Sequence, residues 1–402
     1  MVIMCLLFAG GFSASKVMQR FSENKVTELN SAEKDNVHIS DVIESEKLKS
    51  KYNLLSQYVD AYYLNKKDIE SDEVVDGVLH GVVASLGDKY ADYYNAEEYK
   101  EIMEDNSGEY GGIGTYVTQD KKTGSIILVN PFEGAPAHKA GLKAGDVLLK
   151  VDDKSVVGLS LDEVTSIMKG EAGTTVTVEI NRDGKKLSFD VTREIVDVPT
   201  VGHTVIKDDN IGYVYISSFN QKSGQQFKEA VDELEKQKVD GIVIDLRNNG
   251  GGVLDAAIEV LDRVLPDGLV LYTETNRGRE NEYFSDAESC FSKPYVVLIN
   301  EYSASASEVV AGAIQDFGIG KIVGTTSYGK GVVQSVIPMK GVNTGEAVKL
   351  TTSKYFTPKG RNIDGIGIEP DIKVELDAEK KVKKSEVTVD NQLQCAIDAL
   401  KK

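Results

Sequence analysis

The chain has 402 residues, of which 41% are hydrophobic and 27% are charged, so it is long enough for two or three globular domains. Its net charge of −18 argues against nucleic acid as a partner and indicates a well-solvated, secreted or cell-surface protein. The three cysteines lie far apart and the four histidines show no metal-binding spacing, so we expect no disulfide framework, no metal centre and no cofactor.

The N-terminal segment, residues 1–37, begins with an uncharged stretch that ends at Ser15. Its apolar run Val2–Phe8 is shorter than the roughly 20 residues of a spanning helix, and no basic residues precede it as they do in a signal peptide. We interpret the segment as the remnant of a signal or anchor helix followed by a polar linker; the alternative is a disordered apolar end. This interpretation predicts a protein of the cell envelope, outside the cytoplasm, that is either membrane-anchored or secreted.

Residues 38–106 form a predicted helical region. Apolar residues recur at helical spacing between Asp41 and Val59 and again between Ser71 and Val83, and a third, short helix begins at Ala96. Helices with so apolar a face need a partner, which is either the next domain or a second copy of the chain.

Residues 107–193 form a predicted β-rich module. The pattern changes at Tyr110–Gly114, one helix is expected over Leu161–Met168, and Asp183 with Gly184 signals a hairpin turn between the last two strands. The expected strands cover residues 126–129, 146–151, 175–180 and 186–191.

Residues 194–376 alternate strands with helices, which predicts parallel βαβ units. The expected strands are 211–216, 241–246 and 296–299, and the expected helices are 223–237, 253–265 and one that begins at Ser305. The last segment, residues 377–402, is a charged tail with a final helix over Asn391–Leu400.

The stretch Asn300–Glu308 places three serines between a buried strand and a helix, where α/β enzymes often carry a nucleophile. The alternative role is structural. Ser305 and Glu308 fit the capping box S-x-x-E, so Ser305 could serve only to cap the helix. This stretch alone does not distinguish the two roles.

The glycine-rich turn Asp245–Gly252 also joins a buried strand to a helix. Such a turn points backbone N–H groups outward with a helix dipole behind them, which suits an anion. It lacks the Lys-[Ser/Thr] ending of a phosphate-binding loop and the G-x-G-x-x-G spacing of a dinucleotide site, so a tetrahedral oxyanion is the better candidate. The alternative is a tight turn that only needs positive φ.

Lys330 lies between two glycines in the segment Gly324–Ser335. If the chain is extended there, Lys330, Val332 and Gln334 share one face, and Gln334 could hold the lysine. A lysine acts as a base only when neutral, which requires burial because its ordinary pKa is about 10.4; the alternative is a surface lysine. No histidine follows His203, so serine chemistry in this region favours a Ser-Lys pair.

Taken together, these motifs resemble those of the carboxy-terminal processing peptidases, an S41-type serine protease family with an inserted PDZ domain. The resemblance extends from about Val42 to Leu400. It implies an α/β fold with a ClpP/crotonase-like βαβ peptidase core, an inserted β-rich PDZ domain, and N- and C-terminal helices. The family usually has proline where this chain has Gly250 and Lys89; we expect the first change to keep the donor glycines and the second to leave the active site untouched.

The resemblance also implies roles for five residues of the active site. Ser305 would be the nucleophile, Lys330, 25 residues later, would be the base, and Gln334 would orient the lysine. The N–H groups of Gly251 and Ala306 would form the oxyanion hole.

The middle module resembles a PDZ domain, which binds the free C-terminus of a protein. The resemblance places the substrate carboxylate on the N–H groups of Gly112, Ile113 and Gly114. The apolar wall for the last substrate side chain would consist of Val164, Ile167 and Met168; the alternative for these three is ordinary core.

The resulting prediction is a serine endopeptidase that docks protein substrates by their C-termini and cleaves nearby peptide bonds through an acyl-enzyme. The resemblance further implies a homodimer built by the terminal helices. Two alternatives stay open: a catalytically silent PDZ adaptor, and acyl-thioester chemistry on the same α/β layout.

Overall fold

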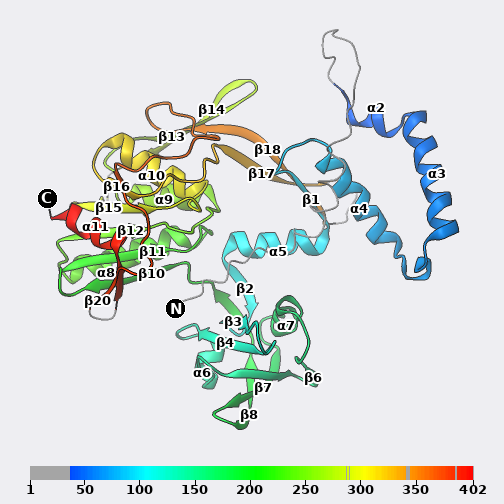
Figure 1. Ribbon diagram of the computed structural model, residues 1–402, viewed down its shortest axis with the longest axis horizontal. Coiled ribbons are helices and arrows are strands. Elements are labelled where there is room, and N and C mark those ends of the chain that lie inside the picture. Colours follow the sequence, from blue (N-terminus) through cyan, green and yellow to red (C-terminus); the bar gives the residue numbers. More distant parts are fainter. Residues whose placement is uncertain (1–36, 287, 289, 341–344, 385–386, 402) are drawn as a thin grey trace. The chain divides into compact units, whose positions relative to one another are not determined.

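The computed structural model describes residues 37–286, 288, 290–340, 345–384 and 387–401 (Figure 1). The predicted anchor and linker, apart from residue 37, therefore lie outside the described residues. The chain divides into two compact units, one ending at Leu79 and the other beginning at His80, and each is described by itself. In the part of the chain that the structure describes, no helix is both long enough and apolar enough to cross a membrane.

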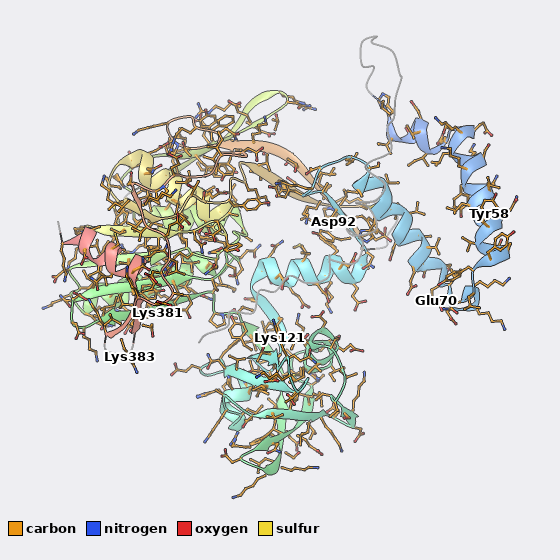
Figure 2. The ribbon with its side chains drawn as sticks, viewed as in Figure 1. Tyr58, Glu70, Asp92, Lys121, Lys381 and Lys383 are labelled. Carbon is orange, nitrogen blue, oxygen red and sulfur yellow. The ribbon has the colours of Figure 1, made fainter. Side chains whose placement is uncertain are left out.

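The first unit is helical, as predicted. Ser45 is the N-cap of the helix Glu46–Tyr62, and its hydroxyl accepts a hydrogen bond from the N–H of Leu48 (3.2 Å). No residue of the first two helices is buried, and Tyr58 stands out from the longer one (Figure 2). The helices are α2 (Ile39–Ile43), α3 (Glu46–Tyr62), the 3-10 turn η1 (Lys66–Asp68) and α4 (Ser71–Ala84), which runs on into the second unit.

In the second unit, α5 (Ala96–Ser107) precedes the predicted β-rich module. The module's sheet has the order β3-β4-β5-β7-β8, with β6 beside β5, and every pairing is antiparallel. The predicted helix over Leu161–Met168 is confirmed as α7, which starts from a capping box of Ser160 and Glu163. The other elements are β2 (Glu109–Gly112), β3 (Thr115–Gln119), β4 (Ile126–Pro131), α6 (Pro136–Ala140), β5 (Val147–Val151), β6 (Lys154–Ser155), β7 (Thr175–Arg182), β8 (Lys185–Thr192) and β9 (Glu194–Asp197).

A second sheet of this unit has the order β10-β11-β12-β15-β16-β19 and is parallel from β11 onward, so the predicted βαβ units are confirmed. Its strands are β10 (Val201–Ile206), β11 (Ile211–Ile216), β12 (Gly241–Asp245), β15 (Tyr295–Ile299), β16 (Lys321–Gly324) and β19 (Ile372–Lys373). Its helices are α8 (Ser223–Lys236), α9 (Leu254–Asp262), α10 (Ala306–Phe317) and α11 (Asn391–Leu400).

Both faces of this parallel sheet are covered, because alternate residues of its central strands enter two separate cores. Ile242 and Ile244 of β12 pack with α8, α9 and α10, whereas Val243 packs with α11. This explains why β12 and β15 are continuous apolar runs. The carboxyl ends of these two rigid strands carry the glycine-rich turn and the serine turn side by side.

A third sheet, of order β1-β18-β13-β14 with β17 beside β18, was not predicted. Most residues of β14 are exposed, so its sequence carries no apolar pattern that would reveal a strand. β1 pairs with β18 so that Asp92 lies opposite Lys349, which brings the segment after α4 beside the chain that follows Lys330. The strands are β1 (Asp92–Tyr94), β13 (Gly268–Thr275), β14 (Gly278–Ser285), β17 (Val332–Pro338) and β18 (Ala347–Phe356); a short hairpin of β20 (Lys381–Lys384) and β21 (Val387–Asp390) precedes α11.

A buried ion-pair network joins the end of β12 to the start of α11. The Arg247 guanidinium lies 2.6 Å from a carboxylate oxygen of Asp245 and 2.9 Å from one of Asp390, the N-cap of α11, and also donates to Gln392 (2.9 Å). Arg247 therefore holds the C-terminal helix against the sheet.

We predict that Arg247→Met lowers the free energy of unfolding by about 3–5 kcal/mol, because it leaves two poorly solvated carboxylates without their cation. Urea denaturation measures this change. The matched control is Arg279→Met, since Arg279 is exposed and pairs with Glu282 at the surface; it should cost less than about 1 kcal/mol. Equal losses in the two variants would contradict the assignment.

Candidate active site

Ser305 occupies a strained position between β15 and α10. Its backbone angles are φ 55° and ψ −114°, a region that residues other than glycine rarely adopt. Hydrogen bonds of its backbone hold it there: its N–H donates to Glu308 Oε2 (2.9 Å), and its carbonyl oxygen accepts from the N–H groups of Glu308 (2.8 Å) and Val309 (2.9 Å). Its backbone and the Glu308 carboxylate thus cap α10.

The other two serines of the turn have structural partners. The hydroxyl of Ser303 donates to the carbonyl oxygen of Leu246 (2.8 Å), and that of Ser307 donates to the carbonyl oxygen of Asn249 (2.9 Å). Both serines are fully buried, whereas Ser305 is partly exposed. Of the three hydroxyls, Ser305 is therefore the one that a substrate can reach.

Gly251 in the glycine-rich turn lies against the serine turn. A Cβ at this position would lie 2.8 Å from Ser305 Cβ and 2.9 Å from the nitrogen of Ala306, and φ is +98°, so only glycine fits. The N–H of Ala306 opens α10, where it has no acceptor within the helix. The N–H of Gly251 donates to Asn249 Oδ1 (2.8 Å), so in this conformation it is engaged within its own turn.

The carboxylate of Glu308 joins the serine turn to the lysine loop. Besides Ser305, it accepts hydrogen bonds from the hydroxyl of Ser327 (2.5 Å) and from the N–H groups of Gly329 (2.6 Å) and Lys330 (2.8 Å). Glu308 has no exposed surface. Glu308, which the sequence predicts only as a helix cap, thus also links two segments that are more than 20 residues apart in the sequence.

The loop after β18 supports the lysine loop from a further side. Asn362 donates to the carbonyl oxygen of Gly331 (3.1 Å), and the N–H of Gly331 donates to Asp364 Oδ1 (3.1 Å). The N–H of Gly365 donates to the carbonyl oxygen of Gly329 (2.9 Å). Lys330 therefore lies between two glycines whose backbone groups are both fixed.

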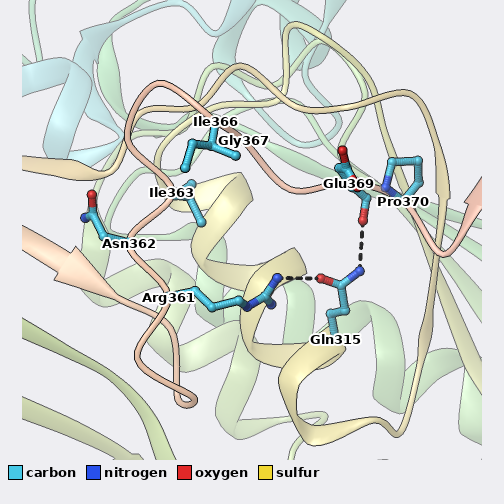
Figure 3. A pocket seen from close by; sticks show the side chains of 8 residues that line it. All are labelled: Gln315, Arg361, Asn362, Ile363, Ile366, Gly367, Glu369 and Pro370. Carbon is cyan, nitrogen blue, oxygen red and sulfur yellow. Dashed lines mark hydrogen bonds between the residues drawn. The ribbon is translucent and has the colours of Figure 1, made fainter.

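A pocket of about 580 Å³ lies on this supporting loop and α10 (Figure 3). Its side chains pair with one another: Arg361 donates to Gln315 (3.0 Å), which donates to the carbonyl oxygen of Glu369 (2.9 Å). Neither Ser305 nor Lys330 is among its lining residues, so it is not the candidate active site.

The surroundings of Lys330 favour a neutral amine. Its side chain is partly buried, and Nζ lies 4.5 Å from the centre of the Tyr90 ring. Burial, followed by the positive charges of Lys349 and Lys89, lowers the pKa of Lys330 to about 8, while Glu308 and Asp88 act in the opposite direction. This is the desolvation that a lysine base requires.

Two expected contacts are not made in this conformation. Among the residues that the structure describes, no hydrogen bond joins the Ser305 hydroxyl to the Lys330 amine. Gln334 donates to Thr351 Oγ1 (3.2 Å) rather than meeting Lys330, and a β-bulge between Val333 and Gln334 interrupts the alternation of faces on which that contact was expected.

The candidate peptide-binding residues of the β-rich module divide into two groups. Val164 and Met168 are buried in the module's core, which fits the alternative of ordinary packing. The side chain of Ile113 is buried there too, which leaves the predicted role of its backbone N–H untested. Ile167 is only partly buried and packs against that core. Gly112 is the last residue of β2, and Gly114 has φ +72°. The loop that we predict to bind the substrate carboxylate therefore directly precedes β3.

Sequence reasoning missed three residues of the site. The sequence patterns indicate Glu308 only as a helix cap, and they indicate no role for Asn249 or Tyr90. The S-x-x-E pattern was a signal for the first, but nothing local indicates that Tyr90, 240 residues before Lys330, lies beside it.

Two family models match the chain: "Peptidase family S41" over residues 210–374 and "PDZ domain" over residues 111–192. The carboxy-terminal-processing protease of Bartonella bacilliformis is 39% identical over 328 residues, 80% of this chain and 74% of that protein. The carboxy-terminal processing protease CtpA of Bacillus subtilis is 35% identical over 81% of this chain and 69% of its own length. A solved S41 protease structure from Bacteroides fragilis shares the fold, with a TM-score of 0.51 and 16% identity over 93% of this chain and 99% of that one.

We predict that Glu308→Gln lowers the free energy of unfolding by about 1.5–3 kcal/mol. The amide cannot accept from four donors, since one of its two ends is itself a donor. Chemical denaturation tests this against Glu369→Gln, whose side chain is exposed and which should stay within about 0.5 kcal/mol of wild type. If Glu308→Gln is as stable as the control, the carboxylate is not the link described.

Proposed function

The chain belongs to the carboxy-terminal processing proteases of peptidase family S41, and from this premise we propose that it cleaves peptide bonds with a Ser305–Lys330 pair. It is a serine-type peptidase with a PDZ domain. The proposal adds the catalytic groups and the path through an acyl-enzyme.

One observation carries the proposal: the Glu308 carboxylate holds the N–H groups of both Ser305 (2.9 Å) and Lys330 (2.8 Å). One buried carboxylate therefore holds the backbone of both the candidate nucleophile and the candidate base. A lysine with a pKa of about 8 is neutral often enough near physiological pH to accept a proton.

In the proposed reaction, neutral Lys330 takes the hydroxyl proton of Ser305 as the oxygen attacks the carbonyl carbon of the peptide bond. The resulting oxyanion accepts hydrogen bonds from the N–H groups of Gly251 and Ala306. The Lys330 ammonium then gives its proton to the leaving amine, and an acyl-enzyme remains on Ser305. Water deprotonated by Lys330 hydrolyses this ester and regenerates both groups.

The reaction requires changes from the described conformation. The N–H of Gly251 has to leave Asn249, and the Ser305 hydroxyl has to meet the Lys330 amine. Gln334 can orient Lys330 only after its amide leaves Thr351. We propose that substrate binding brings these groups together, since catalytic hydrogen bonds are often incomplete before substrate binds.

The PDZ domain is proposed to bind substrate C-termini. An extended peptide adds as a strand beside the carboxylate loop at Gly112, Ile113 and Gly114, and the last side chain contacts the half-exposed Ile167. The partners are then protein substrates with free C-termini. Delivery of the C-terminus to this domain would also gate the active site.

Two further proposals concern assembly and location. The exposed apolar side chains of α3, such as Leu55 and Tyr58, support a homodimer in which a second copy covers them. The uncharged start of the chain supports an extracytoplasmic protein of the cell envelope, secreted or held by an N-terminal anchor. Sedimentation experiments that detect a salt-resistant dimer would support the proposed assembly. Fractionation of cells would test the proposed location.

A catalytically silent PDZ adaptor is the second candidate. The engaged N–H of Gly251 and the unmade contact between Ser305 and Lys330 are the observations that favour it. The two candidates differ in whether wild-type protein cleaves anything at all.

We predict that Ser305→Ala and Lys330→Ala each reduce cleavage of an unfolded protein substrate by about a thousandfold or more, because each removes an obligatory group. Time courses resolved by mass spectrometry measure the loss. Lys373→Ala, at an exposed lysine of β19, is the matched control and should cleave like wild type. Wild-type rates in either active-site variant would contradict the mechanism, and an inactive wild type would favour the adaptor.

We predict that Gly251→Ala lowers kcat by about a hundredfold, because the new methyl group displaces the turn that supplies an oxyanion donor. The neighbouring Gly250→Ala is the control: a Cβ there meets nothing within 4 Å, so kcat should stay within a few-fold of wild type. Thermal melting of both variants separates loss of the donor from loss of the fold. Equal kcat values for the two variants would exclude Gly251 from the oxyanion hole.

A further inference from the structure

The Tyr90 ring has two ammonium groups close to it. Lys330 Nζ lies 4.5 Å from the ring centre and Lys89 Nζ lies 4.6 Å from it. The backbone of Tyr90 is held from its own segment, since its N–H donates to Asp88 Oδ1 (2.9 Å). Two cations on one ring are unusual, because each attraction to the ring is opposed by the repulsion between the charges.

Lys89 also contacts the lysine loop directly. Its Nζ lies 3.4 Å from the hydroxyl of Tyr328 and 5.2 Å from the centre of that ring. Tyr328 precedes the Gly-Lys-Gly sequence, and its N–H donates to the carbonyl oxygen of Ser303 in the serine turn (3.0 Å). Lys89 therefore bridges its own segment and the loop that carries Lys330. This corrects the expectation that the change from proline to Lys89 leaves the active site untouched.

We propose that Tyr90 and Lys89 are positioning residues for the cleavage reaction: the Tyr90 ring holds the amino group of Lys330 in place, and Lys89 sets a second ammonium group against the same ring and against Tyr328 of the lysine loop. The proposal rests on the proposed function, in which Lys330 is the base. It makes a segment that precedes the PDZ domain part of the active site.

The charges around Lys330 determine what each substitution should do. Burial, Lys349 and Lys89 lower the pKa of Lys330, and Glu308 and Asp88 raise it. Lys349 is itself tied to the hydroxyl of Tyr94 (2.5 Å), and Tyr90 is the aromatic neighbour of the amine. Of the two repelling lysines, Lys89 is the more exposed, so its influence is the one that added salt should screen.

The first experiment compares pH profiles of kcat/KM for wild type, Lys89→Met and Lys89→Arg on an unfolded protein substrate. Removing the charge of Lys89 raises the pKa of Lys330, so the rise of activity with pH, expected near pH 8 in wild type, should move to higher pH by about half a unit. Lys89→Arg keeps the charge and should keep the wild-type profile. High ionic strength should shrink the difference between wild type and Lys89→Met.

The second experiment concerns the ring. Tyr90→Leu removes the aromatic face and should lower kcat about tenfold or more with little change in KM, whereas Tyr90→Phe keeps the face and should restore kcat to within a few-fold of wild type. Thermal melting checks that both variants are folded.

The matched control is Lys321→Met, since Lys321 is an exposed lysine at the opposite end of β16 from the serine turn. Its profile should coincide with that of wild type. A profile of Lys89→Met that coincides with wild type would overturn the role of Lys89, and a Tyr90→Phe variant as slow as Tyr90→Leu would overturn that of the ring. If instead wild-type cleavage does not depend on Ser305 and Lys330, the proposed function itself has failed.

Discussion

The buried carboxylate of Glu308 is the interaction on which the site depends. Its two oxygens accept four hydrogen bonds. The donors are the N–H of Ser305, the hydroxyl of Ser327 and the N–H groups of Gly329 and Lys330. A carboxylate with no exposed surface is stable in a protein interior only when its oxygens are fully paired. The same pairing fixes the backbone of the nucleophile and that of the base in one frame, so helix capping and catalytic geometry are properties of one group.

The sheet supplies the rigidity that this frame requires. β12 and β15 are buried on both faces, and their carboxyl ends carry the glycine-rich turn and the serine turn. The strain at Ser305 persists because the hydroxyls of Ser303 and Ser307 tie the two turns together. The pairing of β1 with β18 in the third sheet brings Tyr90 beside Lys330, although the PDZ domain separates them in the sequence.

The sequence predicted what depends on local pattern. The apolar runs of β12 and β15, the helix over Leu161–Met168 and the final helix all follow from periodicity and caps, because burial imposes those patterns directly. The serine turn and the glycine-rich turn could be found because each follows one of these buried strands, and Lys330 because it lies between two glycines. β14 and the bulge at Gln334 could not, since exposed charged strands leave no pattern and a bulge depends on the pairing strand. The contacts of Tyr90 and Asn249 form only in the folded chain, so no local sequence pattern predicts them.

The most direct test of the account is the rate at which a peptidyl fluorophosphonate labels the protein, measured by intact mass and peptide mapping across pH in wild type and in Glu308→Gln. A Ser305–Lys330 pair predicts one label, on Ser305, with a rate that rises with pH through about 8 in wild type because the Lys330 amine must be neutral. In Glu308→Gln that labelling should slow by about tenfold or more, because the shared anchor is weakened. Labelling at another residue, a wild-type rate that ignores pH, or an unchanged rate in Glu308→Gln would contradict the account.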